Sequence, residues 1–326
     1  MRRIAGYGLA LLSLIAAAIW FNNTSRWTMP KIAPTLLAHR GLAQTYDAAG
    51  IDANTCTATR IHQPEHPHIE NTIASMTAAF AAGAGIVELD IHPTTDGLFA
   101  VFHDWTLDCR TDGSGVTREA TMTDLKKLDV GYGYTADGGK TFPFRGKAVG
   151  LMPTLDEVLE TFANRRFLIH IKSNDPAEGE KLAARLAALP QERLKLLMVY
   201  GGERPMAVVR QKLPSISTMA KPQLKTCITR YALLGWSGHV PAECARSVML
   251  IPSNYAQWLW GWPNVFVERM ARVGSEVFVA GPLEGDGTSR GIDRESDLRV
   301  IPSNFAGGIW TNRVDRIAPL IRSGTR

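Results

Sequence analysis

The chain has 326 residues, of which 45% are hydrophobic and 21% charged, which is typical of a globular protein with a sizeable core. Its formal net charge is only +5, and Lys and Arg are scattered rather than clustered, which argues against a nucleic-acid partner. The same balance is compatible with an anionic substrate or an anionic membrane surface, and no sequence feature indicates an oligomeric state.

The first predicted element is an apolar helix at the N-terminus. Arg2 and Arg3 precede an apolar run from Ile4 to Phe21 that is just long enough to cross a bilayer. We therefore expect a signal anchor over residues 1–21, which would make the chain a single-pass inner-membrane protein. The arginines would stay in the cytoplasm, and the globular part would be exported to the periplasmic or extracytoplasmic side. A cleaved signal peptide and a secreted product remain the alternative.

Beyond a linker over residues 22–34, short aliphatic segments alternate with helical patterns through a single domain over residues 35–326. Strands are expected at Thr35–His39, Gly85–Ile91, Phe167–Ile171, Lys195–Tyr200, Ile216–Met219, Val248–Ile251, Glu276–Ala280 and Gly308–Thr311. Strands that alternate with helices indicate a parallel sheet, and eight of them favour a closed (β/α)₈ TIM barrel over an open doubly wound sheet.

Local signals add further elements to this barrel. The turn Thr95-Asp96-Gly97 predicts an accessory hairpin whose second strand is Leu98–His103. A helical pattern over Thr72–Ala82 ends at Gly83, a natural C-cap. A capping box at Thr154-Leu-Asp-Glu157 opens a second helix, and a third is expected over Gly179–Leu189.

The four cysteines fit an exported protein. Cys56, Cys109, Cys227 and Cys244 lack the close paired spacing of a zinc site, so disulfides are the better interpretation. We expect the pairs Cys56–Cys109 and Cys227–Cys244, because the second closes a short loop. Free thiols remain the alternative.

Polar residues gather at the ends of the predicted strands, where a barrel has its active site. His39 and Arg40 end the first strand, and Glu88 and Asp90 share one face of the second. A barrel strand that is buried on both sides should be almost wholly apolar, so these carboxylates need a reason. A coordinated metal is the simplest one.

The chemistry of these residues points to phosphodiester cleavage. Glu88 and Asp90 offer oxygen ligands suited to Mg²⁺ or Ca²⁺. His39 and His103 can act as a general acid–base pair, in which one activates a hydroxyl and the other protonates the leaving oxygen. The positive charges that would hold the phosphate come from two further residues at strand ends, Arg40 and Lys172.

Several motifs, taken in order, resemble the glycerophosphodiester phosphodiesterase family of the phospholipase C-like TIM-barrel superfamily. The similarity extends over about Leu36 to Leu320. The motifs are Leu37-Ala38-His39-Arg40-Gly41, Glu70-Asn71-Thr72, Val87-Glu88-Leu89-Asp90, Thr95-Asp96-Gly97, His103-Asp104, the Pro-Thr-Leu helix entry at 153–155 and Gly308-Ile309-Trp310-Thr311-Asn312-Arg313.

This resemblance implies a TIM barrel that hydrolyses glycerophosphodiesters with one divalent cation, usually Ca²⁺ or Mg²⁺. It implies that His39 and His103 are the catalytic pair and that Glu88 and Asp90 bind the metal. It also implies that Glu70 belongs to the metal site. The family's fourth-strand lysine corresponds to Lys172.

The fourth strand departs from the family pattern. The family has Glu-x-Lys there, with the glutamate as a metal ligand, whereas this chain has His170-Ile171-Lys172. His170 either ligates the metal and shifts the preference towards Mn²⁺ or Zn²⁺, or leaves the ion with fewer protein ligands.

These observations predict a metal-dependent hydrolase that converts small glycerophosphodiesters, the headgroup diesters of phospholipids, to an alcohol and glycerol phosphate. Two alternatives stay open. One is a phospholipase D-like enzyme that acts on lyso- or intact phospholipids, for which a membrane helix would be an advantage. The other is a catalytically silent barrel that binds a phospho-headgroup, an idea motivated by His170.

Overall fold

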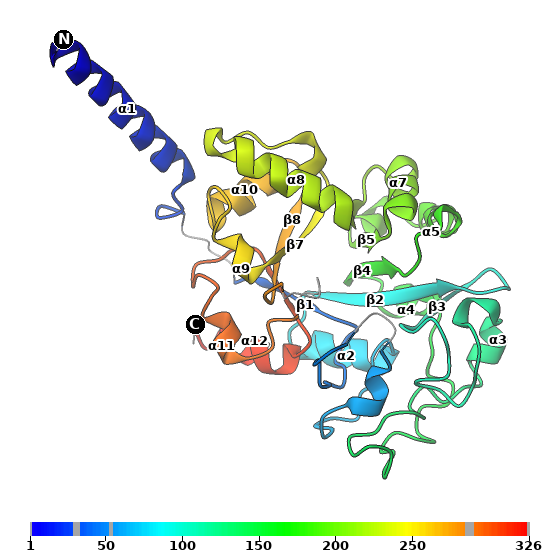
Figure 1. Cartoon of the computed structure of the whole chain (residues 1–326). Helices are drawn as coiled ribbons and strands as arrows, with labels where there is room; N and C mark the ends of the chain where they lie inside the picture. The colour runs from blue at the N-terminus through cyan, green and yellow to red at the C-terminus, as the bar shows by residue number, and fades with distance from the viewer. Residues whose placement is uncertain (1, 29–32, 52–54, 284–289, 325–326) are drawn as a thin grey trace.

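The computed structural model describes residues 2–28, 33–51, 55–283 and 290–324. At its centre, eight parallel strands follow one another in chain order (Figure 1). They are β1 (Thr35–Ala38), β2 (Ile86–Pro93), β4 (Arg166–Ile171), β5 (Leu197–Gly201), β6 (Ser217–Ala220), β7 (Val248–Pro252), β8 (Glu276–Ala280) and β9 (Gly308–Thr311). β1 pairs with β9, and a bridge between Thr218 and Ser247 joins β6 to β7, so the barrel is nearly closed. The predicted TIM barrel is confirmed.

The other regular elements of the described residues are helices and short 3₁₀ turns, most of which pack around these strands (Figure 1). The helices are α1 (Arg2–Asn23), α2 (Ile73–Ala82), α3 (Met122–Leu125), α4 (Leu155–Thr161), α5 (Pro176–Ala187), α6 (Gln191–Leu194), α7 (Glu203–Lys212), α8 (Lys221–Leu234), α9 (Ser253–Ala256), α10 (Asn264–Arg272), α11 (Glu295–Leu298) and α12 (Val314–Arg322). The 3₁₀ turns lie at Thr57–Arg60, Thr117–Glu119, Gly235–Ser237 and Ala242–Cys244.

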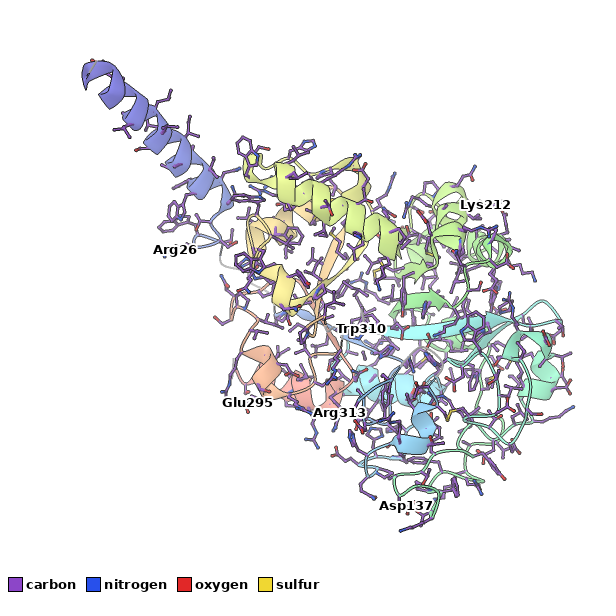
Figure 2. The ribbon with its side chains drawn as sticks, in the orientation of Figure 1. Arg26, Asp137, Lys212, Glu295, Trp310 and Arg313 are labelled. Carbon is purple, nitrogen blue, oxygen red and sulfur yellow. A yellow bond between two sulfur atoms is a disulfide. The ribbon has the colours of Figure 1, made fainter. Side chains whose placement is uncertain are left out.

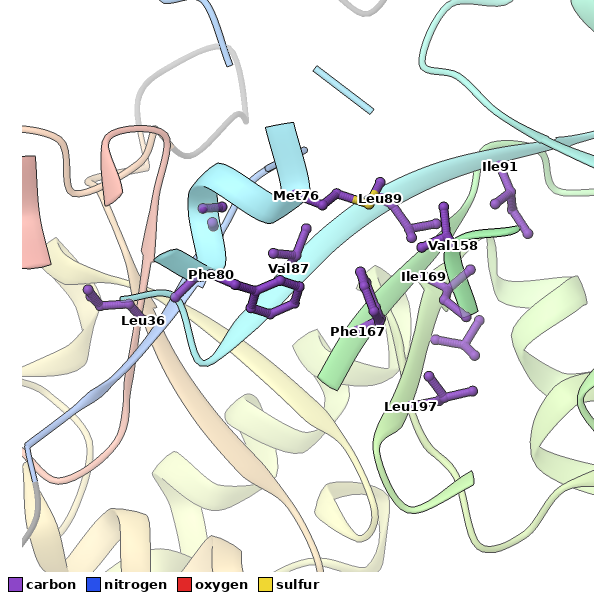
Figure 3. Close-up of a cluster of buried hydrophobic side chains, with 14 of the residues drawn as sticks. Leu36, Met76, Phe80, Val87, Leu89, Ile91, Val158, Phe167, Ile169 and Leu197 are labelled. Carbon is purple, nitrogen blue, oxygen red and sulfur yellow. The ribbon is translucent and has the colours of Figure 1, made fainter. Parts of the chain in front are cut away.

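The second strand shows how the alternation of side chains builds both the core and the site. Val87, Leu89 and Ile91 of β2 face the helices and are buried in the cluster shown in Figure 3. Glu88 and Asp90 lie on the opposite face and are also fully buried. Beyond the barrel, β2 pairs with β3 (Phe99–Val101) in the predicted antiparallel hairpin.

Helix caps match the sequence signals at two places and differ at a third. Thr72 caps α2 and Gly83 ends it with φ 119°, while Thr154 and Glu157 form the predicted capping box of α4. The helix expected from Gly179 begins earlier, at Pro176, because the Asp175 side chain accepts the Ala177 N–H and proline suits the first turn.

α1 extends away from the barrel on the side of α8 and α10 (Figure 1). Its base is held by Asn23, whose Nδ2 donates to the Trp236 carbonyl at 2.8 Å and whose Oδ1 accepts from Arg269 Nη1 at 2.9 Å. Along the part of the chain that the structure describes, no helix has the length and apolarity needed to cross a membrane. The membrane span predicted for residues 1–21 is therefore not supported here.

Both predicted disulfides are present. Cys56 is bonded to Cys109 and Cys227 to Cys244, so all four cysteines are paired. The alternative of free thiols was wrong.

Candidate active site

The ends of three neighbouring strands bring the predicted site residues together at one end of the barrel. β1 ends directly before His39 and Arg40, and β2 directs Glu88 and Asp90 into the barrel. His170 of β4 is the register partner of Asp90. The carboxyl ends of the parallel strands thus form the site, as in other TIM barrels.

The His-Arg-Gly sequence makes a sharp turn after β1. Arg40 has φ 59° and Gly41 has φ 82°, so two consecutive residues lie in the left-handed region. A Cβ atom on Gly41 would lie 2.6 Å from Ser75 Oγ, which leaves no room for a side chain. The turn folds Arg40 back, and its backbone N–H donates to Glu88 Oε2 at 3.1 Å.

His39 is held in one tautomer by hydrogen bonds to two polar side chains, one of which is itself held by a third. Its Nδ1 lies 2.7 Å from Asn312 Oδ1, whose amide nitrogen donates to Asp293 Oδ2 at 2.8 Å. Arg40 Nε donates to His39 Nε2 at 3.1 Å, so Nε2 is an acceptor and Nδ1 carries the hydrogen. Burial, together with the Arg40 charge, lowers the pKa of His39 to about 3. His39 is therefore neutral, with its lone pair on Nε2.

The tryptophan of β9 packs beside this histidine. The ring centroid of Trp310 lies 4.9 Å from that of His39, and Figure 2 shows Trp310 in the middle of the molecule beside the strands. The indole thus covers one side of the imidazole.

His103 has a carboxylate partner instead of an amide. Its Nδ1 lies 2.6 Å from Asp104 Oδ1, and its backbone carbonyl accepts from His92 Nε2 at 3.3 Å. Burial and Arg40 lower the pKa of His103, whereas Asp90 and Asp104 act in the opposite direction. His103 is therefore better placed than His39 to hold a second proton.

Glu88, Asp90 and His170 form the one group of metal-ligating side chains among the described residues whose ligand atoms lie within 4.8 Å of one another. His170 Nδ1 lies 2.7 Å from Asp90 Oδ1. Burial and the neighbouring Asp90 raise the pKa of Glu88 to about 8. Burial would also raise the pKa of Asp90, but cationic neighbours, Lys172 foremost, hold it well below its usual value. Glu88 thus lacks a sufficient positive counter-charge beside the ionised Asp90, as expected where a cation binds.

The predicted phosphate-binding cations border this group. Lys172 Nζ lies 3.5 Å from Asp90 Oδ1, and Arg40 Nε lies 3.3 Å from Asp90 Oδ2. Glu70, predicted to belong to the metal site, lies outside the group. Its two oxygens accept from Arg40 Nη1 at 2.9 Å and from Arg110 Nη1 at 3.0 Å.

Sequence reasoning missed several residues that contact the site, among them Tyr200 and Asn312. Tyr200 stacks on His170, with ring centroids 4.0 Å apart, and its hydroxyl donates to Glu88 Oε1 at 2.6 Å. Asn312 orients His39, as described above. Both stand at the carboxyl end of a predicted strand, so the strand-end rule that identified Glu88 could have found them.

Three comparisons identify relatives of this chain. Residues 39–217, more than half of the chain, match the model of the glycerophosphoryl diester phosphodiesterase family. A glycerophosphodiester phosphodiesterase of Bacillus subtilis (strain 168) is 35% identical over 171 residues, which are 51% of this chain and 55% of that relative. The chain thus matches about half the length of this curated relative.

Solved structures share the fold. The crystal structure of a glycerophosphodiester phosphodiesterase from Agrobacterium tumefaciens str. C58 has a TM-score of 0.58 at 23% identity, covering 89% of this chain and 99% of that one. An Oleispira antarctica phosphodiesterase, solved in complex with the product sn-glycerol-3-phosphate, has a TM-score of 0.54 at 20% identity and covers 90% of this chain and 97% of that one. Together with the family match, these findings show that the chain belongs to the glycerophosphoryl diester phosphodiesterase family.

Proposed function

We propose that this protein hydrolyses glycerophosphodiesters to an alcohol and glycerol phosphate. The reaction would use a divalent cation and two histidines that act as general base and general acid. The observation that carries the proposal is the convergence of His39, the acidic pair of β2 and His170 at one end of the barrel. The Oleispira relative, which holds glycerol phosphate as its product, supports this substrate class. Assay of purified protein with glycerophosphocholine tests the proposal directly.

His39 is the general base. Its Nε2 lone pair accepts from Arg40, and the oxygens of a bound phosphate offer Arg40 a stronger partner. Nε2 can then take a proton from an attacking water molecule while the water oxygen bonds to phosphorus. The Asn312 amide keeps the other ring nitrogen protonated, so that the ring presents only this acceptor to the substrate.

His103 is the general acid. Asp104 fixes its Nδ1–H and stabilises the imidazolium form, so a proton on Nε2 is available for the leaving alcohol oxygen. The bond between phosphorus and that oxygen breaks as the proton arrives. Each turnover moves one proton onto His39 and one off His103, and solvent exchange restores both.

Glu88, Asp90 and His170 would hold the divalent cation, which would neutralise the non-bridging phosphate oxygens. The residues fit such an ion because two buried carboxylates lie together and burial leaves Glu88 short of positive charge. Two oxygen donors suit Ca²⁺ or Mg²⁺, and the imidazole nitrogen of His170 extends the range to Mn²⁺ and Zn²⁺.

Removal of divalent cations with a chelator is expected to abolish hydrolysis of glycerophosphocholine, because the buried carboxylates would then repel the anionic phosphate. Adding back Ca²⁺, Mg²⁺, Mn²⁺ and Zn²⁺ separately, and measuring released choline, identifies the ion that restores it. Full activity after exhaustive chelation would show that the cation is not required.

Asn312→Ala is expected to lower kcat about 5- to 150-fold, because losing one hydrogen bond worth about 1–3 kcal/mol lets the His39 ring rotate and change tautomer. The KM should change little, since Asn312 contacts His39 and Asp293 and no predicted phosphate-binding residue. Steady-state kinetics separate the two parameters. A rise in KM at unchanged kcat would contradict this role.

Phospholipase D-like action on lysophospholipids is the second candidate, favoured by an apolar hollow of about 940 Å³ at the base of α1. Trp20, Trp258 and Trp260 line it, and Trp258 is 77% exposed. Such tryptophans are typical of surfaces that meet lipid headgroups. Comparing glycerophosphocholine with lysophosphatidylcholine decides between the candidates: faster cleavage of the soluble diester supports the first.

We also propose that the globular part is exported, anchored through the N-terminal helix or released after its cleavage. The two disulfides support an oxidising compartment. Fractionation of cells that express the full chain, followed by protease treatment of spheroplasts, tests both the location and the anchor.

A further inference from the structure

Arg110 lies beneath the site and is only 2% exposed. Its guanidinium donates to side chains from four separate segments. The bonds are Nε to Asp104 Oδ2 at 2.8 Å, Nη1 to Glu70 Oε2 at 3.0 Å, Nη1 to Tyr134 Oη at 2.7 Å and Nη2 to Thr57 Oγ1 at 2.7 Å. A planar fork with five donors can satisfy this set, and a lysine cannot.

Two of these partners, Asp104 and Glu70, use their second carboxylate oxygen to hold a residue of the proposed mechanism. Asp104 Oδ1 lies 2.6 Å from His103 Nδ1, and Glu70 Oε1 accepts from Arg40 Nη1 at 2.9 Å. Arg110 therefore connects the proposed general acid, His103, to Arg40, whose positive charge would hold the phosphate. Displacing it frees both carboxylates to rotate, and each rotation moves a residue at the site.

The Cys56–Cys109 disulfide lies directly beside Arg110 and its partner Thr57. Cys109 precedes Arg110, and Cys56 precedes Thr57, so the bridge ties together the two backbones that the Arg110–Thr57 hydrogen bond also joins. The segment that carries Tyr134 packs against the same place. Gly133 N donates to the Arg110 carbonyl at 3.2 Å, and a Cβ on Gly133 would lie 1.9 Å from the Cys109 carbonyl oxygen.

We propose that Arg110 is a positioning residue, which sets His103 and Arg40 relative to each other and is itself held in place by the Cys56–Cys109 disulfide. The inference rests on the proposed diester hydrolysis. It implies that the geometry of the general acid depends on an intact bridge that lies outside the barrel strands.

The test compares two substrates that differ in their need for a general acid. The alkoxide of choline leaves only with a proton, whereas p-nitrophenolate leaves without one. Arg110→Lys keeps the positive charge but loses the planar guanidinium with its five donors. We therefore expect kcat/KM on glycerophosphocholine to fall about 100-fold and kcat/KM on glycerol p-nitrophenyl phosphate to fall about 10-fold or less. A merely structural role would lower the two rates equally, because fewer molecules would be active.

The Cys56→Ser/Cys109→Ser double variant provides the second arm and serves also if Arg110→Lys does not fold. It should lower kcat/KM on glycerophosphocholine more than kcat/KM on glycerol p-nitrophenyl phosphate, as expected for Arg110→Lys. The matched control, Cys227→Ser/Cys244→Ser, removes the other disulfide and should leave the ratio unchanged. An unchanged ratio in Arg110→Lys, or in the double variant when it alone folds, overturns the inference and leaves the proposed function intact. If the unaltered protein cleaves neither diester, the proposed function fails and the inference fails with it.

Discussion

His103→Ala is expected to lower kcat on glycerophosphocholine by about 10²- to 10⁴-fold, and His39→Ala by a similar factor. His103→Ala removes the proton donor that Asp104 orients, and His39→Ala removes the neutral acceptor that Asn312 orients. The measurement is choline release at saturating substrate, with folding checked by circular dichroism.

The two variants should differ in their response to the leaving group. His103→Ala should recover most of its activity on glycerol p-nitrophenyl phosphate, whose leaving group needs no proton, whereas His39→Ala should not. His62→Ala, a change at an exposed histidine, is the matched control and should retain full activity. Undiminished hydrolysis in both active-site variants would refute the two-histidine mechanism. A wild-type protein that binds phosphate headgroups and cleaves none would instead be the silent barrel.

Local sequence patterns were sufficient to predict the barrel. β8 and β9 have the bounds expected from their aliphatic runs, and the alternation in β2 correctly placed Glu88 and Asp90 on one face. The start of α5 was misplaced because a capping aspartate and a proline lie ahead of the periodic pattern. Patterns of this kind report on neighbours a few residues apart, which is enough to define strands and helices.

The hydrogen-bond partners inside the site could not be predicted in this way. Asn312 lies 273 residues from His39 and Tyr200 lies 112 residues from Glu88, so only the pairing of strands in the barrel brings each pair together. The partners of Glu70 could not be predicted from local patterns either. A glutamate beside the site has the chemistry of a metal ligand, yet two arginines take its two oxygens, and one of them, Arg110, is 40 residues away.

Asp90→Asn is expected to abolish the stabilisation that divalent cations confer on the protein and to abolish hydrolysis with it. A cation that binds only the folded state raises stability by about 2.7 kcal/mol at a concentration 100 times its Kd. The asparagine keeps the shape of the side chain but removes one of the two buried charges that would hold the ion. Thermal melts with and without cation measure the difference. Glu192→Gln, at a carboxylate whose side chain is 83% exposed, is the control and should melt like the parent protein.

The cation effect should also grow with pH, because a proton and the cation compete for Glu88. Burial and Asp90 raise the pKa of Glu88 to about 8 from its ordinary value of about 4.5. Because the folded-state pKa is the higher one, the stability that the proton provides is fully present below about pH 4.5 and is lost as the pH rises through about 8. In that range a bound cation replaces the proton and offsets the loss, so the rise in melting temperature caused by the cation should be larger near pH 9 than near pH 6. A smaller rise at the higher pH would mean that Glu88 keeps its proton when the cation binds, and would remove it from the ligand set.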